Sequence, residues 1–230
     1  MRIKLFCDSA DLDEMRQLAL NPQVKGFTTN PSLMRKAGVD NYRAFAQRAI
    51  AAFPNQPISL EVFADEFLEM EHQAHKIASW GQNIFVKIPI CNTKGVSAAP
   101  LIGRLTAAGI KVNITAVMCA AQVDDILDSL GLTPAIISIF AGRIADTGRS
   151  PIGVINYALG TRQRAYHEVL WASPRQVLDV YIADGCGADI ITCTPDLIRK
   201  LPLEGKNLKE YSRLTVKQFY DDAKAARYSI

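Results

Sequence analysis

The amino-acid sequence predicts an α/β protein built as a single (β/α)8 barrel, the TIM-barrel fold, with an additional C-terminal helix. Two observations favour this fold class. Eight short apolar or β-branched runs start 21 to 34 residues apart, which leaves room for one helix between consecutive strands. The turn after the first run, CDSADLDE, contains no glycine, whereas a doubly wound sheet normally has a glycine-rich loop there. A closed barrel is therefore preferred to the doubly wound alternative.

The expected strands alternate with segments in which apolar residues recur at helical spacing. Asp11 and Glu14 resemble a capping box at the start of the first helix. The final segment, TVKQFYDDAKAARYSI, predicts the extra helix from about residue 215. The predicted strands are 3–8, 24–30, 58–63, 84–90, 112–117, 136–142, 168–173 and 190–195, and the later helices lie near 42–53, 67–77, 101–108, 123–130 and, with a weaker pattern, 151–163 and 174–184.

Composition limits the class of protein. The 230 residues are 49% hydrophobic and 21% charged, which is typical of one globular domain over 1–230. The net charge of +3 does not favour a nucleic-acid partner. Neither a membrane span nor a signal peptide is expected, because no long uninterrupted apolar segment is present. Five cysteines without CxxC spacing indicate reduced thiols and a cytoplasmic location.

Polar residues occur near the carboxyl ends of nearly all the predicted strands. A (β/α)8 barrel places its active site at these ends, so this pattern is unusual for a purely structural core. The residues are Asp8, Asn30, Glu61, Lys87, Asn113, Thr115, Ser138, Ser173 and Thr192.

Lys87 interrupts the apolar run IFVKIPI. Alternation places it on the face of Phe85 and Pro89, opposite Val86 and Ile88. If the opposite face packs under helices, Lys87 points into the barrel, where loss of hydration disfavours the charged amine. A neutral amine can form a Schiff base with a carbonyl group. The alternative is a strand-end lysine that extends to water or pairs with a carboxylate, and the strand pattern leaves both open.

The other polar residues also allow two interpretations. Asp8 and Glu61 are either salt-bridge partners of Lys87 or groups that transfer protons beside it. Asn113 and Thr115 share one strand face and fit either a polar interior or a binding site.

Two loop arginines follow the sixth and seventh predicted strands. Arg143 and Arg175 are either solvated or, with Ser173, form an anion site, because guanidinium groups match phosphate geometry. His72 and His75 have metal-like spacing, but the apolar face of that helix lies elsewhere, so we expect a solvated surface and no metal site.

Six segments resemble the transaldolase family, and the likeness extends along essentially the whole chain. GFTTNPS at 26–32 is similar to the first family signature, and FVKIP at 85–89 to the second, which surrounds the Schiff-base lysine. LEVF, VNIT, SIFAGRI and ASPR follow in the family's order. The family fold is a (β/α)8 barrel, in agreement with the strand count.

The resemblance implies a role for each residue. Lys87 would form an imine with a ketose phosphate, and Asp8 would take the C4 hydroxyl proton as the C3–C4 bond breaks. Glu61, with Thr115 and a water molecule, would transfer protons during imine formation and hydrolysis. No cofactor or metal is implied, and the small members often form homo-oligomers. The dihydroxyacetone hydroxyls would be held by Asn30, Asn113 and Ser138, and the terminal phosphate by Arg143, Ser173 and Arg175.

Three hypotheses compete. The first is a transaldolase, which moves a dihydroxyacetone unit between sugar phosphates, and the second is a fructose 6-phosphate aldolase, which releases free dihydroxyacetone. Transaldolases resemble this chain in having Glu61 and Phe140, where fructose 6-phosphate aldolases have Gln and Tyr. Phe140 has no hydroxyl group to help protonate the bound carbanion, which favours transfer to an aldehyde acceptor. The chain length, however, is that of the small aldolase branch. Cys91 and Pro174 depart from the family pattern beside the pocket, so an unusual acceptor sugar is an alternative. A catalytically silent barrel that binds sugar phosphates is the third hypothesis.

Overall fold

The computed structural model describes residues 1–229. The chain divides into two compact units, Met1–Ile198 and Arg199–Ile230, which are described in turn.

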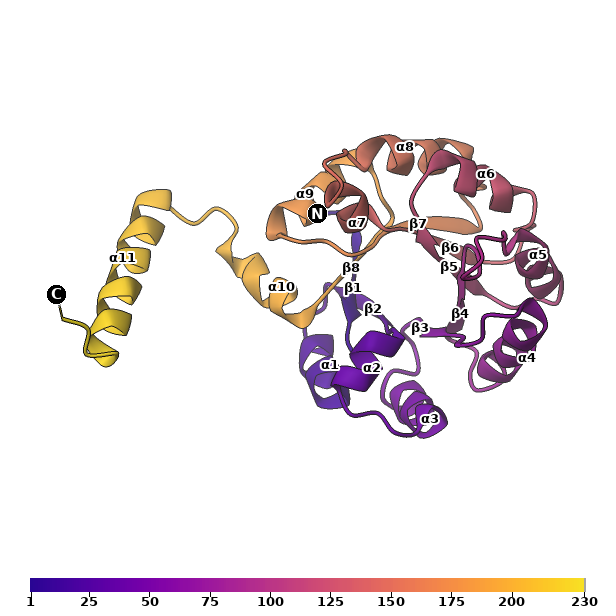
Figure 1. The fold of residues 1–230 in the computed structure, drawn as a ribbon, viewed down its shortest axis with the longest axis horizontal. Helices are drawn as coiled ribbons and strands as arrows, with labels where there is room; N and C mark the ends of the chain where they lie inside the picture. The colour runs from indigo at the N-terminus through magenta and orange to yellow at the C-terminus, as the bar shows by residue number, and fades with distance from the viewer. Residues whose placement is uncertain (230) are drawn as a thin grey trace. The chain divides into compact units, whose positions relative to one another are not determined.

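The first unit is a closed barrel of eight parallel strands in sequence order (Figure 1). β1 pairs with β2 on one side and with β8 on the other, so the ring has no free edge. The predicted fold class is therefore confirmed. The strands are β1 (Lys4–Asp8), β2 (Val24–Thr28), β3 (Ile58–Glu61), β4 (Ile84–Pro89), β5 (Val112–Val117), β6 (Ala135–Ile139), β7 (His167–Trp171) and β8 (Ile190–Cys193).

Helices surround the ring of strands (Figure 1). The first begins where the sequence predicts it, because the Asp11 carboxylate accepts hydrogen bonds from the amides of Asp13 and Glu14. The weaker predictions at 151–163 and 174–184 are also confirmed as helices. The helices are α1 (Leu12–Ala19), α2 (Pro31–Lys36), α3 (Tyr42–Ala52), α4 (Phe67–Ala78), α5 (Ala99–Ala107), α6 (Ala120–Leu127), α7 (Ala141–Ala145), α8 (Ile152–Thr161), α9 (Val177–Cys186) and α10 (Pro195–Lys200).

The sixth predicted strand, 136–142, is too long. β6 ends at Ile139, and α7 begins at Ala141. The backbone turns at Phe140, which has φ −80° and ψ 61°. The residues IFAG at 139–142 are as apolar as the strand before them, but Ala141 and Gly142 already belong to the first turn of α7. This correction matters because α7 carries one of the predicted arginines.

Two further short helices were not predicted. Each is separated from the preceding strand by one or two residues and has proline as its first residue, Pro31 in α2 and Pro195 in α10. Proline suits this position because its missing N–H would have no partner within the helix. In α2 the Asn30 side chain accepts a hydrogen bond from the Leu33 amide at 3.0 Å, so Asn30 is a helix cap.

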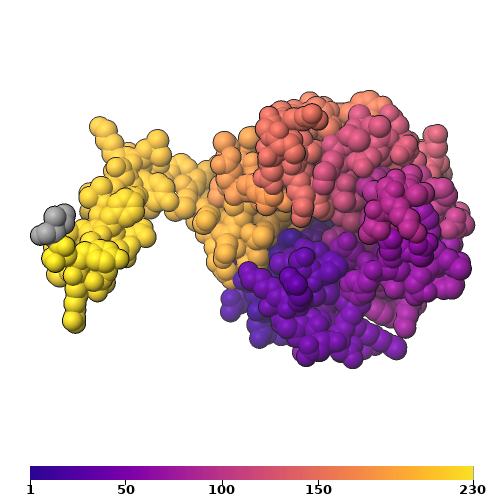
Figure 2. Space-filling view, viewed as in Figure 1, coloured from indigo at the N-terminus to yellow at the C-terminus, as the bar shows by residue number. Residues whose placement is uncertain are grey.

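The interior of the barrel is filled by side chains. Phe6 of β1 packs in a buried cluster with Ile136, Leu170 and Ile190, which come from the neighbouring strands β6, β7 and β8. The Phe6 ring has room because β2 carries Gly26 beside it, where a Cβ atom would lie 2.6 Å from the ring. In Figure 2 no open channel passes through the middle of the barrel unit, as expected when side chains fill its interior.

The second unit consists of a short 3-10 helix (Leu201–Leu203) and α11 (Leu208–Ala225). α11 starts earlier than the predicted residue 215 because Asn207 caps it, accepting hydrogen bonds from the amides of Lys209 and Glu210. α11 contains no buried residue, and Phe219 and Tyr220 are each 65% exposed. No helix within residues 1–229 is long and apolar enough to cross a membrane.

Candidate active site

A cavity of about 510 Å³ lies at the carboxyl ends of the strands. Strand alternation explains its lining, because residues two apart face the same side. Asn113 and Thr115 in β5 are one such pair, and Phe85, Lys87 and Pro89 share a face in β4. All of the predicted site residues line this one cavity: Asp8, Asn30, Glu61, Lys87, Asn113, Thr115, Ser138, Phe140, Arg143, Ser173 and Arg175.

Lys87 occupies the position that alternation predicts. Val86 and Ile88 are fully buried, whereas Lys87 is 7% exposed and lines the cavity. The strand register sets Glu61 beside Lys87, and their side chains form an ion pair with Nζ 3.0 Å from Oε2. Lys87 Nζ also donates a hydrogen bond to the Thr29 carbonyl at 2.7 Å. A buried amine next to one carboxylate can release a proton to it.

Asp8 ends β1 and is the second carboxyl group of the cavity. Its Oδ1 accepts a hydrogen bond from Thr28 Oγ1 at 2.8 Å. Burial raises the pKa of Asp8, while the positive charge of Lys87 and the Thr28 hydrogen bond oppose the increase. A carboxyl group with a raised pKa gives and takes a proton more readily near neutral pH than an exposed one. Asp8 and Glu61 therefore differ in environment, since only Glu61 pairs directly with the amine.

Asn113 and Ser138 form a buried polar chain across three strands. Ser138 Oγ donates to Asn113 Oδ1 at 2.6 Å, and Asn113 Nδ2 donates to Ser59 Oγ at 3.0 Å. An asparagine amide nitrogen has two donors, so one remains for a ligand. This chain fixes which atoms Asn113 can offer to the cavity.

Asn30 and Thr115 reach the cavity from opposite sides of Lys87 in the strand order. The side-chain oxygen of Asn30 caps α2, so the side-chain nitrogen Nδ2 is the group left for a ligand. Thr115 is 2% exposed and precedes Ala116, whose φ of 64° is left-handed. The β5–β6 pairing shifts register there, as in a β-bulge, which re-aims side chains at a strand end.

The two arginines lie at the rim of the cavity and have different surroundings. Arg143 lies 6.0 Å from the centre of the Phe140 ring and has no carboxylate partner among the described residues. Arg175 is paired with Asp146 through two hydrogen bonds. Ser173 precedes Arg175 on the loop after β7 and has a left-handed φ of 60°. Two guanidinium groups and a serine at one rim can bind an anion.

The loop that carries Ser173 touches the backbone of α7. A Cβ atom at Gly142 would lie 1.6 Å from the Ser173 carbonyl oxygen, so only glycine allows this approach. The Gly142 amide also donates to the Ala172 carbonyl at 3.3 Å. This close contact sets the distance between Arg143 on α7 and Arg175 on the loop.

Sequence reasoning missed several residues of the site. Ser59 and Thr28 are each on the cavity side of a strand, and alternation from Glu61 and Asn30 could have found them. Thr192 was noted at a strand end and lines the cavity without an assigned role.

Tyr42 and Asp146 were also missed, and they had no such signal. Tyr42 comes from the start of α3, and its hydroxyl donates to the Glu61 carbonyl at 2.9 Å. Burial raises the pKa of this phenol. Neither Tyr42 nor Asp146 is on a strand, so only the folded chain shows where they lie.

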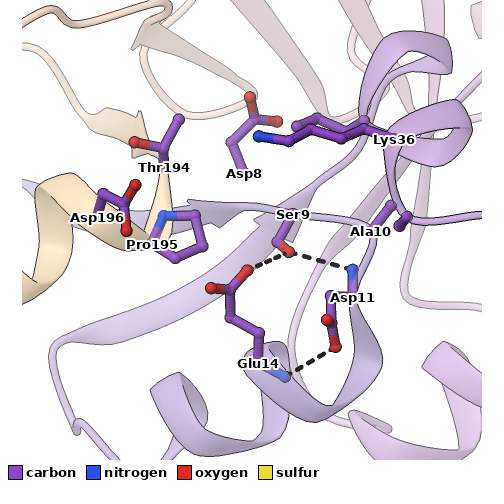
Figure 3. Close-up of a pocket in the computed structure, with 11 residues that line it drawn as sticks. Asp8, Ser9, Ala10, Asp11, Glu14, Lys36, Thr194, Pro195 and Asp196 are labelled. Atoms are coloured by element: carbon purple, nitrogen blue, oxygen red, sulfur yellow. Dashed lines mark hydrogen bonds between the residues drawn. The ribbon is translucent and has the colours of Figure 1, made fainter.

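A second cavity of about 360 Å³ adjoins the first and shares Asp8, Leu33 and Thr194 with it. Figure 3 shows Lys36 extending from α2 toward Asp8. In the same view Ser9 Oγ donates to Glu14 Oε2 at 3.0 Å. Asp8 thus stands between two cavities and can be approached from either.

Within residues 1–229 no three His, Cys, Asp or Glu side chains gather closely enough to hold a metal ion. His72 lies on an exposed helix face, 3.7 Å from Glu69.

Comparisons with known proteins find similar chains of known family. A probable transaldolase of Brucella ovis is 34% identical over 220 residues, covering 91% of this chain and 94% of its own. One from Bdellovibrio bacteriovorus is 31% identical, covering 91% and 95%. One from Dehalococcoides mccartyi is 32% identical, covering 83% and 86%.

Solved structures support the fold alone. The 3-hexulose-6-phosphate synthase from Salmonella typhimurium is 12% identical with a TM-score of 0.57, covering 87% of this chain and 96% of its own. A putative phosphonomutase from Burkholderia cenocepacia is 11% identical with a TM-score of 0.58 and 94% coverage of both chains. A family model described as transaldolase/fructose-6-phosphate aldolase matches residues 5–230. With curated relatives above 30% identity over most of its length, the chain belongs to the transaldolase/fructose-6-phosphate aldolase family.

Proposed function

We propose that the protein is a transaldolase that moves a dihydroxyacetone unit from a ketose phosphate to an aldose phosphate through an imine on Lys87. The observation that carries the proposal is the buried Lys87 amine, 3.0 Å from the Glu61 carboxylate, in the cavity that Asp8 also lines. A purely binding protein has no need of an amine and two carboxyl groups in this arrangement.

The first step is attack by the amine. Lys87 transfers a proton to Glu61, and the neutral nitrogen adds to the keto carbon of fructose 6-phosphate or sedoheptulose 7-phosphate. Glu61 returns the proton to the resulting hydroxyl group, which leaves as water when the imine forms. Thr115 and a water molecule assist these transfers. The 3.0 Å contact supports the role of Glu61.

The second step is cleavage of the C3–C4 bond. Asp8 takes the proton of the C4 hydroxyl, the aldose phosphate leaves, and the electron pair is delocalised into the imine. The raised pKa of Asp8 suits a group that must first accept this proton and later return it to the acceptor. The imine acts as the electron sink, and no metal or cofactor enters the proposal.

The remaining residues hold the substrate at its two ends. Asn30, Asn113 and Ser138 bind the dihydroxyacetone hydroxyls. Asn30 does so through its amide nitrogen, because its oxygen caps α2. Arg143, Ser173 and Arg175 bind the phosphate group at the rim.

Transfer is favoured over release of free dihydroxyacetone. Phe140 lines the cavity and brings no hydroxyl group to protonate the carbanion. The carbanion therefore persists until an aldehyde arrives. Pro174 also lines the cavity and Cys91 follows β4, so an unusual acceptor sugar is the main alternative within transfer.

Borohydride trapping tests the imine. After incubation with fructose 6-phosphate and reduction, mass spectrometry is expected to find one adduct, on the peptide that contains Lys87. Lys36 is the matched control, since it lines the neighbouring cavity and offers an exposed amine. Lys87→Met is expected to abolish the adduct and Lys36→Met to leave it. A folded protein without an adduct at Lys87 contradicts the proposal.

A donor assay separates transferase from lyase. With fructose 6-phosphate alone, a transaldolase stops after about one turnover, because the dihydroxyacetone unit stays on the enzyme. Adding an aldose phosphate acceptor restores turnover. Sustained release of aldehyde without acceptor would assign the protein to the aldolase branch instead.

Two further expectations accompany the proposed function. A cytoplasmic location remains a prediction, supported by five cysteines without CxxC spacing. Nucleic acid and membrane partners are not expected, and the sugar phosphates are the proposed ligands.

A further inference from the structure

Asp146 is a carboxylate at the phosphate end of the cavity to which neither the sequence nor the proposed mechanism assigns a role. It directly follows α7, and its two oxygens bind Arg175 from the loop after β7. Arg175 Nε donates to Oδ1 at 3.2 Å, and Nη2 donates to Oδ2. Two parallel hydrogen bonds fix the plane of a guanidinium group as well as its position.

The same helix holds Arg175 from its other end. Gly142 lies in the first turn of α7, and a Cβ atom there would lie 3.3 Å from Arg175 Nε and 1.6 Å from the Ser173 oxygen. Arg175 is thus confined between Gly142 and Asp146, the two ends of one short helix. The phosphate-binding loop and α7 form a single unit.

Arg143 offers the contrast. It is exposed and lacks a carboxylate partner among residues 1–229, with only the Phe140 ring beside it. One arginine of the proposed phosphate site is therefore held by a carboxylate and the other is not. A guanidinium group that is already oriented loses less side-chain entropy when it binds an anion.

We propose that Asp146 is a positioning residue that orients Arg175 for the phosphate group of the substrate. The proposal rests on the proposed function, because it takes a sugar phosphate as the ligand. Both side chains of the pair are about half exposed, at 53% and 52%, so the pair contributes little to folding stability. Loss of the Asp146 carboxylate should therefore weaken anion binding and leave folding stability nearly unchanged.

Steady-state kinetics test this role. Asp146→Ala is expected to raise KM for fructose 6-phosphate about tenfold and to change kcat less than about twofold, since ground-state and transition-state binding are lost equally. With fructose, which has no phosphate, kcat/KM should stay unchanged. Asp146→Asn, which keeps an acceptor oxygen, should give a smaller increase. Asp125→Ala is the matched control, because Asp125 is an exposed carboxylate on α6 outside the cavity.

A double-mutant cycle tests whether Asp146 acts through Arg175. In an Arg175→Ala background, Asp146→Ala should raise KM no further, because the residue it positions is gone. An equal increase in both backgrounds overturns the proposal. So does a lower KM in Asp146→Ala, which would make Asp146 a competitor of the phosphate, or an equal loss with fructose, which would indicate a general structural role.

Direct binding of inorganic phosphate separates this inference from the proposed function. Calorimetry is expected to give a Kd about tenfold higher for Asp146→Ala than for the unsubstituted protein. If Asp146→Ala weakens phosphate binding but the protein shows neither transferase activity nor an imine, the role of Asp146 is supported and the proposed function is contradicted. Normal transfer without a shift in KM or Kd would end the role of Asp146 alone.

Discussion

Asp8 combines burial with a proposed role in which it must be ionised to accept a proton. Burial raises the pKa of Asp8, so the folded protein favours its protonated form more than the unfolded chain does. The corresponding stability is present below the ordinary pKa of 3.8 and is lost as pH rises through the raised value. The ionised form of Asp8 therefore destabilises the fold relative to its protonated form.

Asp8→Asn should separate stability from activity. The amide keeps an acceptor for Thr28 and removes the buried charge, so we expect the melting temperature at about pH 7 to rise by roughly 2–4 °C, the shift for about 1 kcal/mol in a chain of this size. The gain should shrink as pH falls toward about 4, while transfer activity is lost throughout. Thermal unfolding at several pH values measures this. A variant less stable than the unsubstituted protein at neutral pH would contradict the expectation.

Gly142 is constrained by close packing and not by its own conformation. Gly142→Ala is expected to displace the Ser173 loop, because the new Cβ atom would lie 1.6 Å from a backbone oxygen. We expect KM for a phosphorylated donor to rise about tenfold or more. Gly153→Ala, in α8, is the control, since nothing lies within 4 Å of its Cβ position and alanine favours a helix. Similar kinetics for the two variants would refute the packing argument.

At the scale of single elements, α2 shares a residue with the site. Asn30 caps this helix with its oxygen and faces the cavity. Asn30→Asp should keep the cap and the stability but weaken donor binding, because the amide donors are gone. Asn30→Ala should lose both and cost about 1 kcal/mol of unfolding free energy. Denaturant titrations and KM values measure the two effects. Equal stability loss in both variants would exclude the capping role.

The sequence predicted most elements and many of the residues that line the cavity, and alternation accounts for those that lie on strands. A closed barrel requires alternation in each strand, and this periodicity is local, so Lys87 could be oriented without knowing its neighbours. The short helices could not be predicted in this way. α7 has five residues, fewer than two turns, and its apolar letters continue the pattern of β6.

Contacts from outside the strands needed the structure itself. The pairing of Asp146 with Arg175 joins residues 29 apart in the chain, and no periodicity links them. The roles of the site residues stay predictions until the kinetic experiments are done.

For the whole molecule, α11 is the largest feature without a task. Within the second unit, α11 is stabilised by ion pairs along the helix, such as that of Lys217 with Asp221. Each such pair stabilises a helix by only about 0.3–0.5 kcal/mol. Phe219 and Tyr220 remain mostly exposed. A homo-oligomer, in which a second copy of the chain covers these aromatic side chains, stays our proposal.

Light scattering tests the assembly. Replacing Phe219 and Tyr220 by serine should lower the molar mass from that of an oligomer to that of a single chain, because the apolar area that favours association is removed. Leu20→Ser is the control, since Leu20 is 84% exposed but belongs to the barrel unit. A single-chain mass for the unsubstituted protein would dismiss the proposal.

The pairing of β1 with β8 has a consequence for synthesis. While the nascent chain leaves the ribosome, the strand that ends at Asp8 has no partner on one side until residues 190–193 emerge. The cavity that Asp8 and Thr194 both line therefore cannot be complete until the chain has been synthesised through β8. Until then one strand edge is open to wrong partners.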